Sequence, residues 1–102
     1  MMLPEDLIAE ALEASNPIEA VFALVDNGDV DMRDLGGFVA DNADGSWIHP
    51  WASEGFAYLD LGNGIALAAA WDDAGFWDVF ETTVAEAEAE IAAREDDEET
   101  EG

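Results

Sequence analysis

The sequence contains no cysteine and no lysine. Without cysteine the chain forms no disulfide, offers no thiolate to a metal and performs no thiol chemistry, which fits a reducing compartment. The only basic residues are Arg33 and Arg94, which stand against 26 aspartates and glutamates. Because phosphate binding requires lysine and arginine, direct electrostatic binding to nucleic acid, anionic membranes and acidic substrates is excluded. Basic proteins and cations remain as partners.

Long apolar runs are also missing. No stretch approaches the roughly 18 apolar residues that a membrane-spanning helix needs. Residues 1–6 have neither the basic residues nor the continuous apolar segment of a signal peptide. We therefore expect a soluble cytoplasmic protein that does not associate with membranes.

The chain does contain enough apolar material for a core. Hydrophobic residues make up 50% of the 102 positions, which predicts one folded domain. The formal net charge is nevertheless −24. Nearly all carboxylates must therefore lack an intramolecular cation, and compaction of the chain works against charge repulsion. A few lysines would relieve that repulsion, so a functional hypothesis has to explain why there are none.

Helix signals begin the chain. Pro4 and the acidic residues that follow it predict a first helix, which ends near Ser15. The segment Asn16-Pro17-Ile18-Glu19 combines an N-cap residue, a proline at the first helical position and a glutamate three residues after the cap. This capping-box arrangement predicts a second helix over residues 17–26.

Two further helices are expected. Apolar residues recur at helical spacing over residues 31–42, although Gly36 and Gly37 each cost about 1 kcal/mol relative to alanine. Near the end of the chain, Thr83-Val84-Ala85-Glu86 is another capping-box pattern. It predicts a helix that runs to about Arg94.

Strand signals lie between these helices. Residues 47–51 are rich in aromatic side chains but include Pro50, so they predict an edge strand or an extended loop. Residues 56–61 and 65–71 predict two strands. Gly62-Asn63-Gly64 joins them, and it has the residue types that tight hairpin turns require.

A third strand is expected over residues 76–81, with a helix that starts near Asp73 as the alternative. The predicted fold class is therefore α+β, with N-terminal helices, an antiparallel three-stranded meander and a C-terminal helix. The domain is expected to span residues 1–94. Residues 95–102 carry acid at a helix C-terminus, where the helix dipole opposes it, and are expected to form a frayed, flexible acidic tail.

The residues that could carry chemistry do not form a convincing active site. His49 is the only histidine and lies among aromatic residues, so we interpret it as a packing residue. The serines lie in turn or cap contexts. The segment after Asp26 superficially resembles a calcium-binding loop, but Met32 and Phe38 occupy the positions that need glycine and glutamate. No enzymatic activity, metal site or cofactor is therefore expected.

The acidic residues can instead imitate nucleic acid. Duplex DNA carries one negative charge per roughly 1.7 Å of its axis. Carboxylates on one face of a strand repeat at about 6.6 Å, and those four residues apart on a helix at about 6 Å, similar to phosphates along one strand. The predicted partner-binding acidic surface comprises Asp60, Asp72, Asp73, Asp78, Glu86, Glu90, Glu95, Asp96 and Asp97.

With its small size, lack of lysine and cysteine, and acidic C-terminal segment, the chain resembles phage and mobile-element inhibitors of bacterial defence that mimic DNA. These are the anti-CRISPR and anti-restriction proteins, and the resemblance is one of composition, without a shared motif. It implies a basic nucleic-acid-binding protein as partner, such as a CRISPR effector or a restriction complex subunit, in the host bacterial cytoplasm. No individual functional residue follows from it.

Two alternatives explain the same acidity. Proteins of haloarchaea are similarly acidic and poor in lysine, but they usually retain more arginine and have fewer large apolar side chains. This chain has two basic residues, four tryptophans and five phenylalanines, which favours the DNA mimic. A small acidic binding partner of a basic protein is the other alternative. A homodimer is considered beside the monomer.

Overall fold

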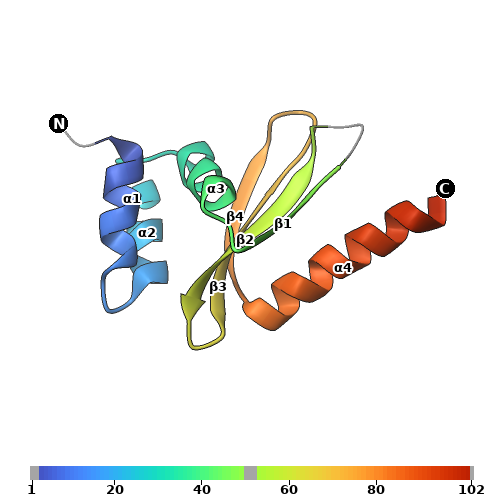
Figure 1. Cartoon of the computed structure of the whole chain (residues 1–102). Helices are drawn as coiled ribbons and strands as arrows, with labels where there is room; N and C mark the ends of the chain where they lie inside the picture. Colours follow the sequence, from blue (N-terminus) through green and yellow to red (C-terminus); the bar gives the residue numbers. More distant parts are fainter. Residues whose placement is uncertain (1–2, 50–52, 102) are drawn as a thin grey trace.

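The computed structural model describes residues 3–49 and 53–101, and of residues 96–101 it describes only the backbone. The described chain is α+β, with an antiparallel sheet between helices (Figure 1). Its helices are α1 (Pro4–Leu12), α2 (Pro17–Asp26), α3 (Met32–Asp41) and α4 (Val84–Glu101). Its strands are β1 (Gly45–Ile48), β2 (Gly55–Gly62), β3 (Ile65–Trp71) and β4 (Trp77–Thr83).

The four strands form a meander in the order β1-β2-β3-β4, with every pair antiparallel. The prediction of three strands was therefore wrong. The extra strand, β1, comes from the aromatic segment before Pro50 and pairs Trp47 with Phe56 and Ile48 with Gly55. It is short and lies at an edge, in keeping with the limit that the proline sets on ladder hydrogen bonds. Pro50 and Trp51 lie outside the described residues.

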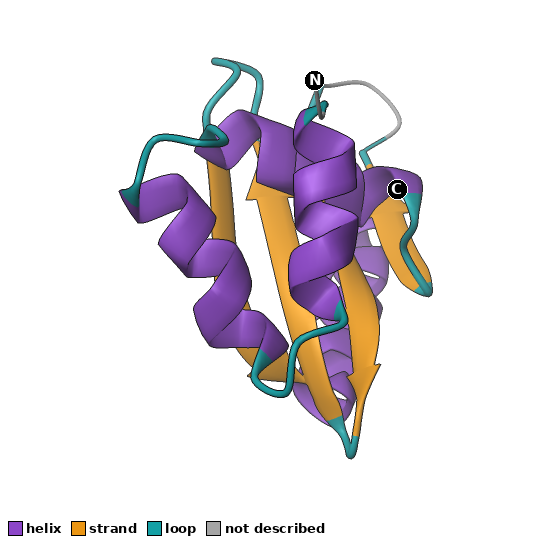
Figure 2. Ribbon diagram, turned by 90° about the vertical axis from the view of Figure 1, so that its left-hand side faces the viewer, coloured by secondary structure: helices purple, strands orange, loops and turns teal. Residues whose placement is uncertain are grey.

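Helices cover both faces of the sheet. On one face α3 packs against β2, β3 and β4, and α1 packs against α3 and α2 (Figure 2). The core on this side is built around side chains that are fully buried: Ile8, Val21, Leu35, Val39, Leu67 and Ala69. On the opposite face α4 crosses the sheet over a thinner layer made of Phe56, Tyr58, Ala66, Ala68 and Ala87. The alternation of β3 thus places Leu67 and Ala69 on one face and Ala66 and Ala68 on the other.

The local signals at the start of α2 are confirmed. The Asn16 side-chain oxygen accepts a hydrogen bond from the Glu19 amide at 3.2 Å. The Asn16 side-chain amide donates to the Glu19 carboxylate at 3.1 Å. Helix α2 covers the predicted range, whereas α1 ends at Leu12, before the predicted Ser15.

The hairpin between β2 and β3 is also confirmed. Gly62, Asn63 and Gly64 have φ angles of 95°, 57° and 81°, a left-handed backbone that glycine and asparagine adopt most readily. A β-bulge lies between Asp60 and Gly62, at the start of this turn.

Helix α4 is longer than predicted. Its backbone remains helical to Glu101, beyond the predicted end near Arg94. The segment from Glu95 to Glu101 contains neither glycine nor proline, and glutamate is a good helix former, so local propensity outweighs the unfavourable dipole there. The mobility predicted for this acidic segment stays a prediction.

Candidate functional site

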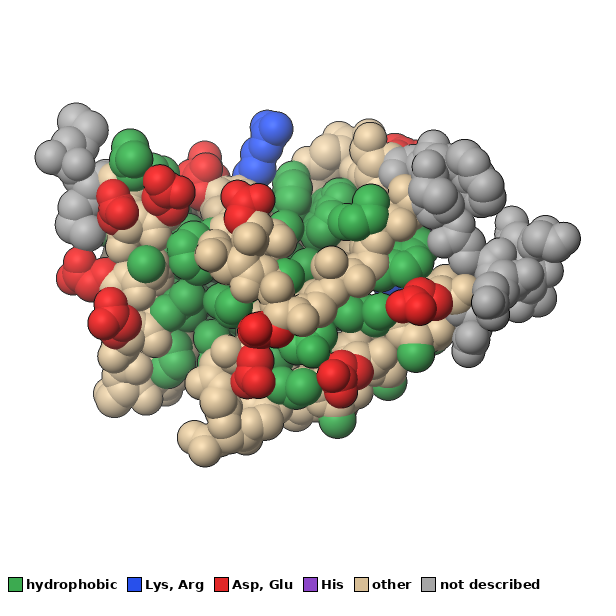
Figure 3. Space-filling view, viewed as in Figure 1, with side chains coloured by type: hydrophobic (Ala, Val, Ile, Leu, Met, Phe, Trp, Pro, Cys, Tyr) green, Lys and Arg blue, Asp and Glu red, His purple; other side chains and the backbone are tan. Residues whose placement is uncertain are grey.

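The described carboxylates lie at the surface. Among the side chains whose burial is described, no charged side chain is buried, and of the Asp and Glu side chains only Glu54 is half-buried. They occur on all four helices and on β2 and β4, and one face of the molecule shows them dispersed around apolar side chains (Figure 3). Among the described residues a single ion pair forms, between Arg94 Nε and Glu90 Oε2 at 2.8 Å. Almost all of the negative charge is therefore left for solvent, ions or a partner.

The predicted surface divides between the two ends of the sheet. Asp60 lies opposite Ala66, beside the β2–β3 hairpin. The start of α4 lies at the same end, since the Val84 amide donates to the Gly64 carbonyl at 2.9 Å. Asp72 and Asp73 lie in the β3–β4 turn at the other end. The predicted carboxylates thus do not form one continuous patch.

The group at the β3–β4 turn consists of Asp72, Asp73 and Asp78. Asp72 Oδ1 accepts hydrogen bonds from the amides of Ala74 and Phe76 at 3.0 and 3.1 Å, so this carboxylate shapes the turn. Asp73 accepts a hydrogen bond from the Ser53 amide and holds the loop before β2. Asp78 is exposed on β4 and makes no hydrogen bond or ion pair with another described residue. It is the carboxylate of this group that is best placed to meet a partner.

The predicted carboxylates on α4 have mixed roles. Thr83 caps the helix by accepting a hydrogen bond from the Glu86 amide at 3.1 Å, and the Glu86 carboxylate accepts from the Thr82 hydroxyl at 3.1 Å. Glu90 holds Arg94. Glu95 is exposed. The side chains of Asp96 and Asp97 lie outside the described residues.

A second acidic cluster surrounds Tyr58 and was not predicted. The Tyr58 hydroxyl donates to Glu88 Oε2 at 3.3 Å, while Asp44 Oδ2 accepts from the Asp60 amide at 2.7 Å. Burial of the ring raises the pKa of Tyr58, and the negative charges of Glu88, Asp44 and Asp60 raise it further. The phenol is thereby held in its neutral, donating form. The sequence signal that could have indicated this cluster is the single tyrosine in an apolar strand. A buried tyrosine hydroxyl needs a hydrogen-bond partner, which in so acidic a chain is most often a carboxylate.

Gly45 makes this arrangement possible. It lies opposite Tyr58 in the β1–β2 ladder. A Cβ at position 45 would overlap the tyrosine ring, with the ring Cζ 3.1 Å away. The glycine therefore leaves the space in which the aromatic ring extends over β1.

We predict that Tyr58 titrates above its ordinary pKa of about 10. The unfolded chain would then ionise first, so the contribution of Tyr58 to stability is complete below about pH 10 and is lost as the pH rises through the folded pKa. As Tyr58 is the only tyrosine, near-ultraviolet absorption of the phenolate measures it directly.

The variant Glu88→Gln should lower this pKa without returning it to the ordinary value, because burial is the larger cause. Glu95→Gln, on the same helix, serves as the control and should leave the titration unchanged. An ordinary pKa in the parent protein would contradict the arrangement.

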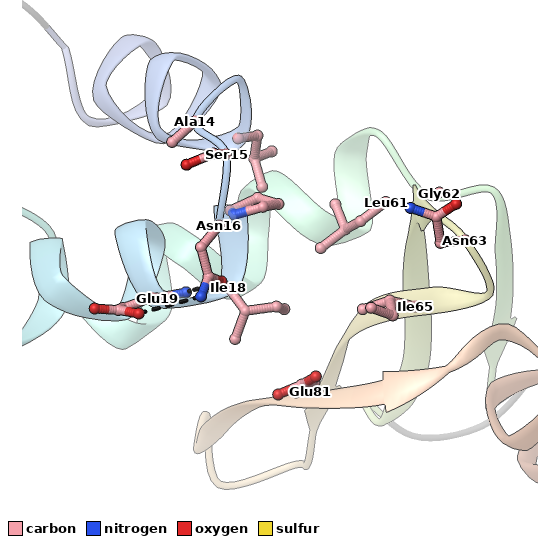
Figure 4. A pocket seen from close by; sticks show the side chains of 12 residues that line it. Ala14, Ser15, Asn16, Ile18, Glu19, Leu61, Gly62, Asn63, Ile65 and Glu81 are labelled. Carbon is pink, nitrogen blue, oxygen red and sulfur yellow. Dashed lines mark hydrogen bonds between the residues drawn. The ribbon is translucent and has the colours of Figure 1, made fainter.

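An open hollow of about 700 Å³ lies between the α1–α2 connection and the β2–β3 hairpin (Figure 4). Leu12, Ile18, Leu61 and Ile65 supply its apolar side chains. Its charged lining residues are Glu19 and Glu81, and no basic residue lines it. The hollow therefore favours cationic over anionic groups.

The segment after α2 folds as a helix end. Gly28 has a φ of 82°, and the amides of Asp29 and Val30 both donate to the Leu24 carbonyl, at 2.9 and 3.3 Å. Val30 is buried in the core. Within residues 3–49 and 53–95, no three His, Asp or Glu side chains are placed to hold a metal ion.

No family model, curated protein or solved structure significantly matches the chain. None of the helices in the described part of the chain is both long and apolar enough to span a membrane. The function is therefore inferred from the charges and contacts of the described residues.

Proposed function

We propose that this protein is an acidic inhibitor that occupies the DNA-binding surface of a bacterial defence complex in the host cytoplasm. An anti-CRISPR role is the first choice and an anti-restriction role the second. The observation that carries the proposal is the set of exposed carboxylates, with one described ion pair, on a folded α+β framework. The protein acts by binding and not by catalysis.

The spacing of carboxylates on α4 supports this proposal, because it is similar to the spacing of phosphates along a DNA strand. Glu86 and Glu90 are four residues apart on α4, which gives a separation of about 6 Å along the helix. Asp78 adds an exposed carboxylate on β4. A cleft lined with lysine and arginine would attract the charges of Glu86 and Asp78 over long range, as it attracts DNA, and would replace Arg94 as the partner of Glu90.

The contacts of Arg94, one of the two cations, reduce its repulsion of a basic partner. Besides its ion pair with Glu90, the Arg94 guanidinium lies over the rings of Trp47 and Phe56, 5.4 and 5.3 Å from their centroids. Its charge is therefore engaged within the molecule. Arg33 is exposed on α3, on the other side of the sheet.

The test is competition with DNA. A CRISPR effector or a restriction complex is mixed with labelled duplex DNA, and the protein should displace the DNA at near-stoichiometric amounts and at about 0.15 M salt, where the Debye length is about 8 Å. The double variant Asp78→Lys/Glu95→Lys should weaken this competition about tenfold, equivalent to about 1.4 kcal/mol.

Glu5→Lys/Glu10→Lys is the matched control, because it changes the net charge equally but lies on α1, in the outer helix layer. It should compete like the parent protein. Failure to displace DNA from any such complex would refute the proposed function.

Salt adaptation is the second candidate, and one observation favours it: the carboxylates occur on every helix, including the outer pair α1 and α2. A protein adapted to molar salt should unfold when salt is lowered, because its self-repulsion is then unscreened. The proposed inhibitor should instead unfold cooperatively on heating at low salt. Circular dichroism during a salt titration separates the two.

A further inference from the structure

Strand β4 forms an open edge of the sheet. It is last in the order β1-β2-β3-β4 and pairs with β3 without interruption from Ile65↔Thr83 to Trp71↔Trp77. No described strand pairs with its outer side. Backbone groups along that side can therefore accept another strand.

Helix α4 leaves part of this edge uncovered. The helix begins directly after β4, but Arg94 lies over Trp47 of β1 and Phe56 of β2, so its path leads away from β4 (Figure 1). As a result Phe80 is 37% exposed, and Phe76, just before the strand, is 67% exposed.

The exposed apolar side chains continue the core to the surface. The ring of Phe80 lies beside buried Phe56, with centroids 6.3 Å apart. Asp78 is on the same face of β4 as Phe80, two residues away, and Glu81 is on the opposite face. This edge thus combines exposed aromatic and acidic side chains with backbone groups that pair with no described strand. We call it the β4 edge (residues 76–83).

We propose that the β4 edge binds an extended segment of a basic partner, which adds to the sheet as a fifth strand. The segment carries an apolar side chain opposite Phe80 and lysine or arginine opposite Asp78 and Glu81. This inference rests on the proposed function for the basic character of the partner, and it specifies how that partner docks.

Charge selects this occupant. A second copy of the chain would bring Asp78 and Glu81 against like charges, which destabilises a strand pair. The opposite edge is a poorer site, because β1 has only four residues, Gly45, Ser46, Trp47 and Ile48, and none is charged. A basic strand gains both ladder hydrogen bonds and ion pairs at the β4 edge.

The test uses the full chain and a synthetic peptide built on the repeat Lys-Val-Thr-Lys. Paired antiparallel to β4, this repeat places valine opposite Phe80 and lysine opposite Glu81 and Asp78. Hydrogen exchange of the backbone amides, followed by NMR at about 0.15 M salt, should show new protection in β4 when the peptide binds. The same peptide N-methylated at every residue keeps its side-chain charge but has no backbone N–H on either edge with which to pair, so it should give no such protection. The double variant Asp78→Asn/Phe80→Ser should weaken peptide binding about tenfold.

Ile48→Ser/Ser46→Ala is the matched control, because it alters exposed side chains on the other edge strand. It should leave binding unchanged. No binding, equal binding of the methylated peptide, or protection outside β4 would overturn docking at this edge without affecting DNA competition. Protection of β4 together with failed DNA competition would refute the proposed function and retain the strand-binding edge.

Discussion

Replacing Gly36 by alanine is expected to leave the protein about 1–3 kcal/mol less stable than replacing the adjacent Gly37 by alanine. A Cβ at position 36 would overlap the ring of Trp77, with its Cζ3 atom 3.1 Å away. That ring cannot move freely, because it stacks on Trp71 with centroids 4.9 Å apart. A Cβ at position 37 meets no other atom within 4 Å.

The two substitutions form a matched pair. Both glycines lie inside α3, so each alanine gains the same helix propensity of about 1 kcal/mol, and the difference isolates the overlap with Trp77. Thermal unfolding should separate the two variants by several degrees, since 1 kcal/mol corresponds to about 4–8 °C for a domain of this size. Equal melting temperatures would show that α3 does not press on Trp77.

Replacing Leu67 by alanine is expected to destabilise the fold by about 2–5 kcal/mol. The side chain is fully buried at the centre of the sheet, among the core residues of the α3 side. Its removal leaves a cavity between β3 and α3, and the packed sheet and helix can relax only partly to fill it. Urea unfolding, followed by circular dichroism, measures the loss as a lower midpoint.

Leu3→Ala is the control, because Leu3 is 55% exposed before α1. Its free energy of unfolding should change by no more than about 0.5 kcal/mol. A loss at Leu67 as small as the loss at Leu3 would contradict the core described for this face.

Features set by neighbouring residues could be predicted from the sequence. Asn16 and Glu19 cap α2 through contacts three residues apart, and the Gly62-Asn63-Gly64 turn needs only its own backbone angles. The predicted third strand, over residues 76–81, is confirmed as β4 and not as the alternative helix.

Features set by distant residues could not be predicted. The sequence left an edge strand and an extended loop as alternatives for residues 47–51, and β1 realises the first. Its pairing places Gly45 and Gly55 close against the rings of Tyr58 and Trp71. Neither contact is local in sequence. The glycines of α3 looked equivalent for the same reason, although only Gly36 faces a tryptophan.

The candidate site was predictable only as a list of carboxylates. Helical spacing relates Glu86 to Glu90, but it does not show that Asp60 and Asp72 lie at opposite ends of the sheet. Nor does it show that Asp72 is engaged in its own turn while Asp78 is open to a partner. Strand register decides both, and register depends on the whole sheet.

Arg94 links α4, the helix that carries it, to the short edge strand β1. A strand of four residues and a helix with an acidic C-terminus each gain little from local structure. The guanidinium lies over Trp47 of that strand and is anchored to Glu90 of that helix. Opening of either element removes this contact from the other, so we expect β1 and the part of α4 that carries Arg94 to open together in local unfolding.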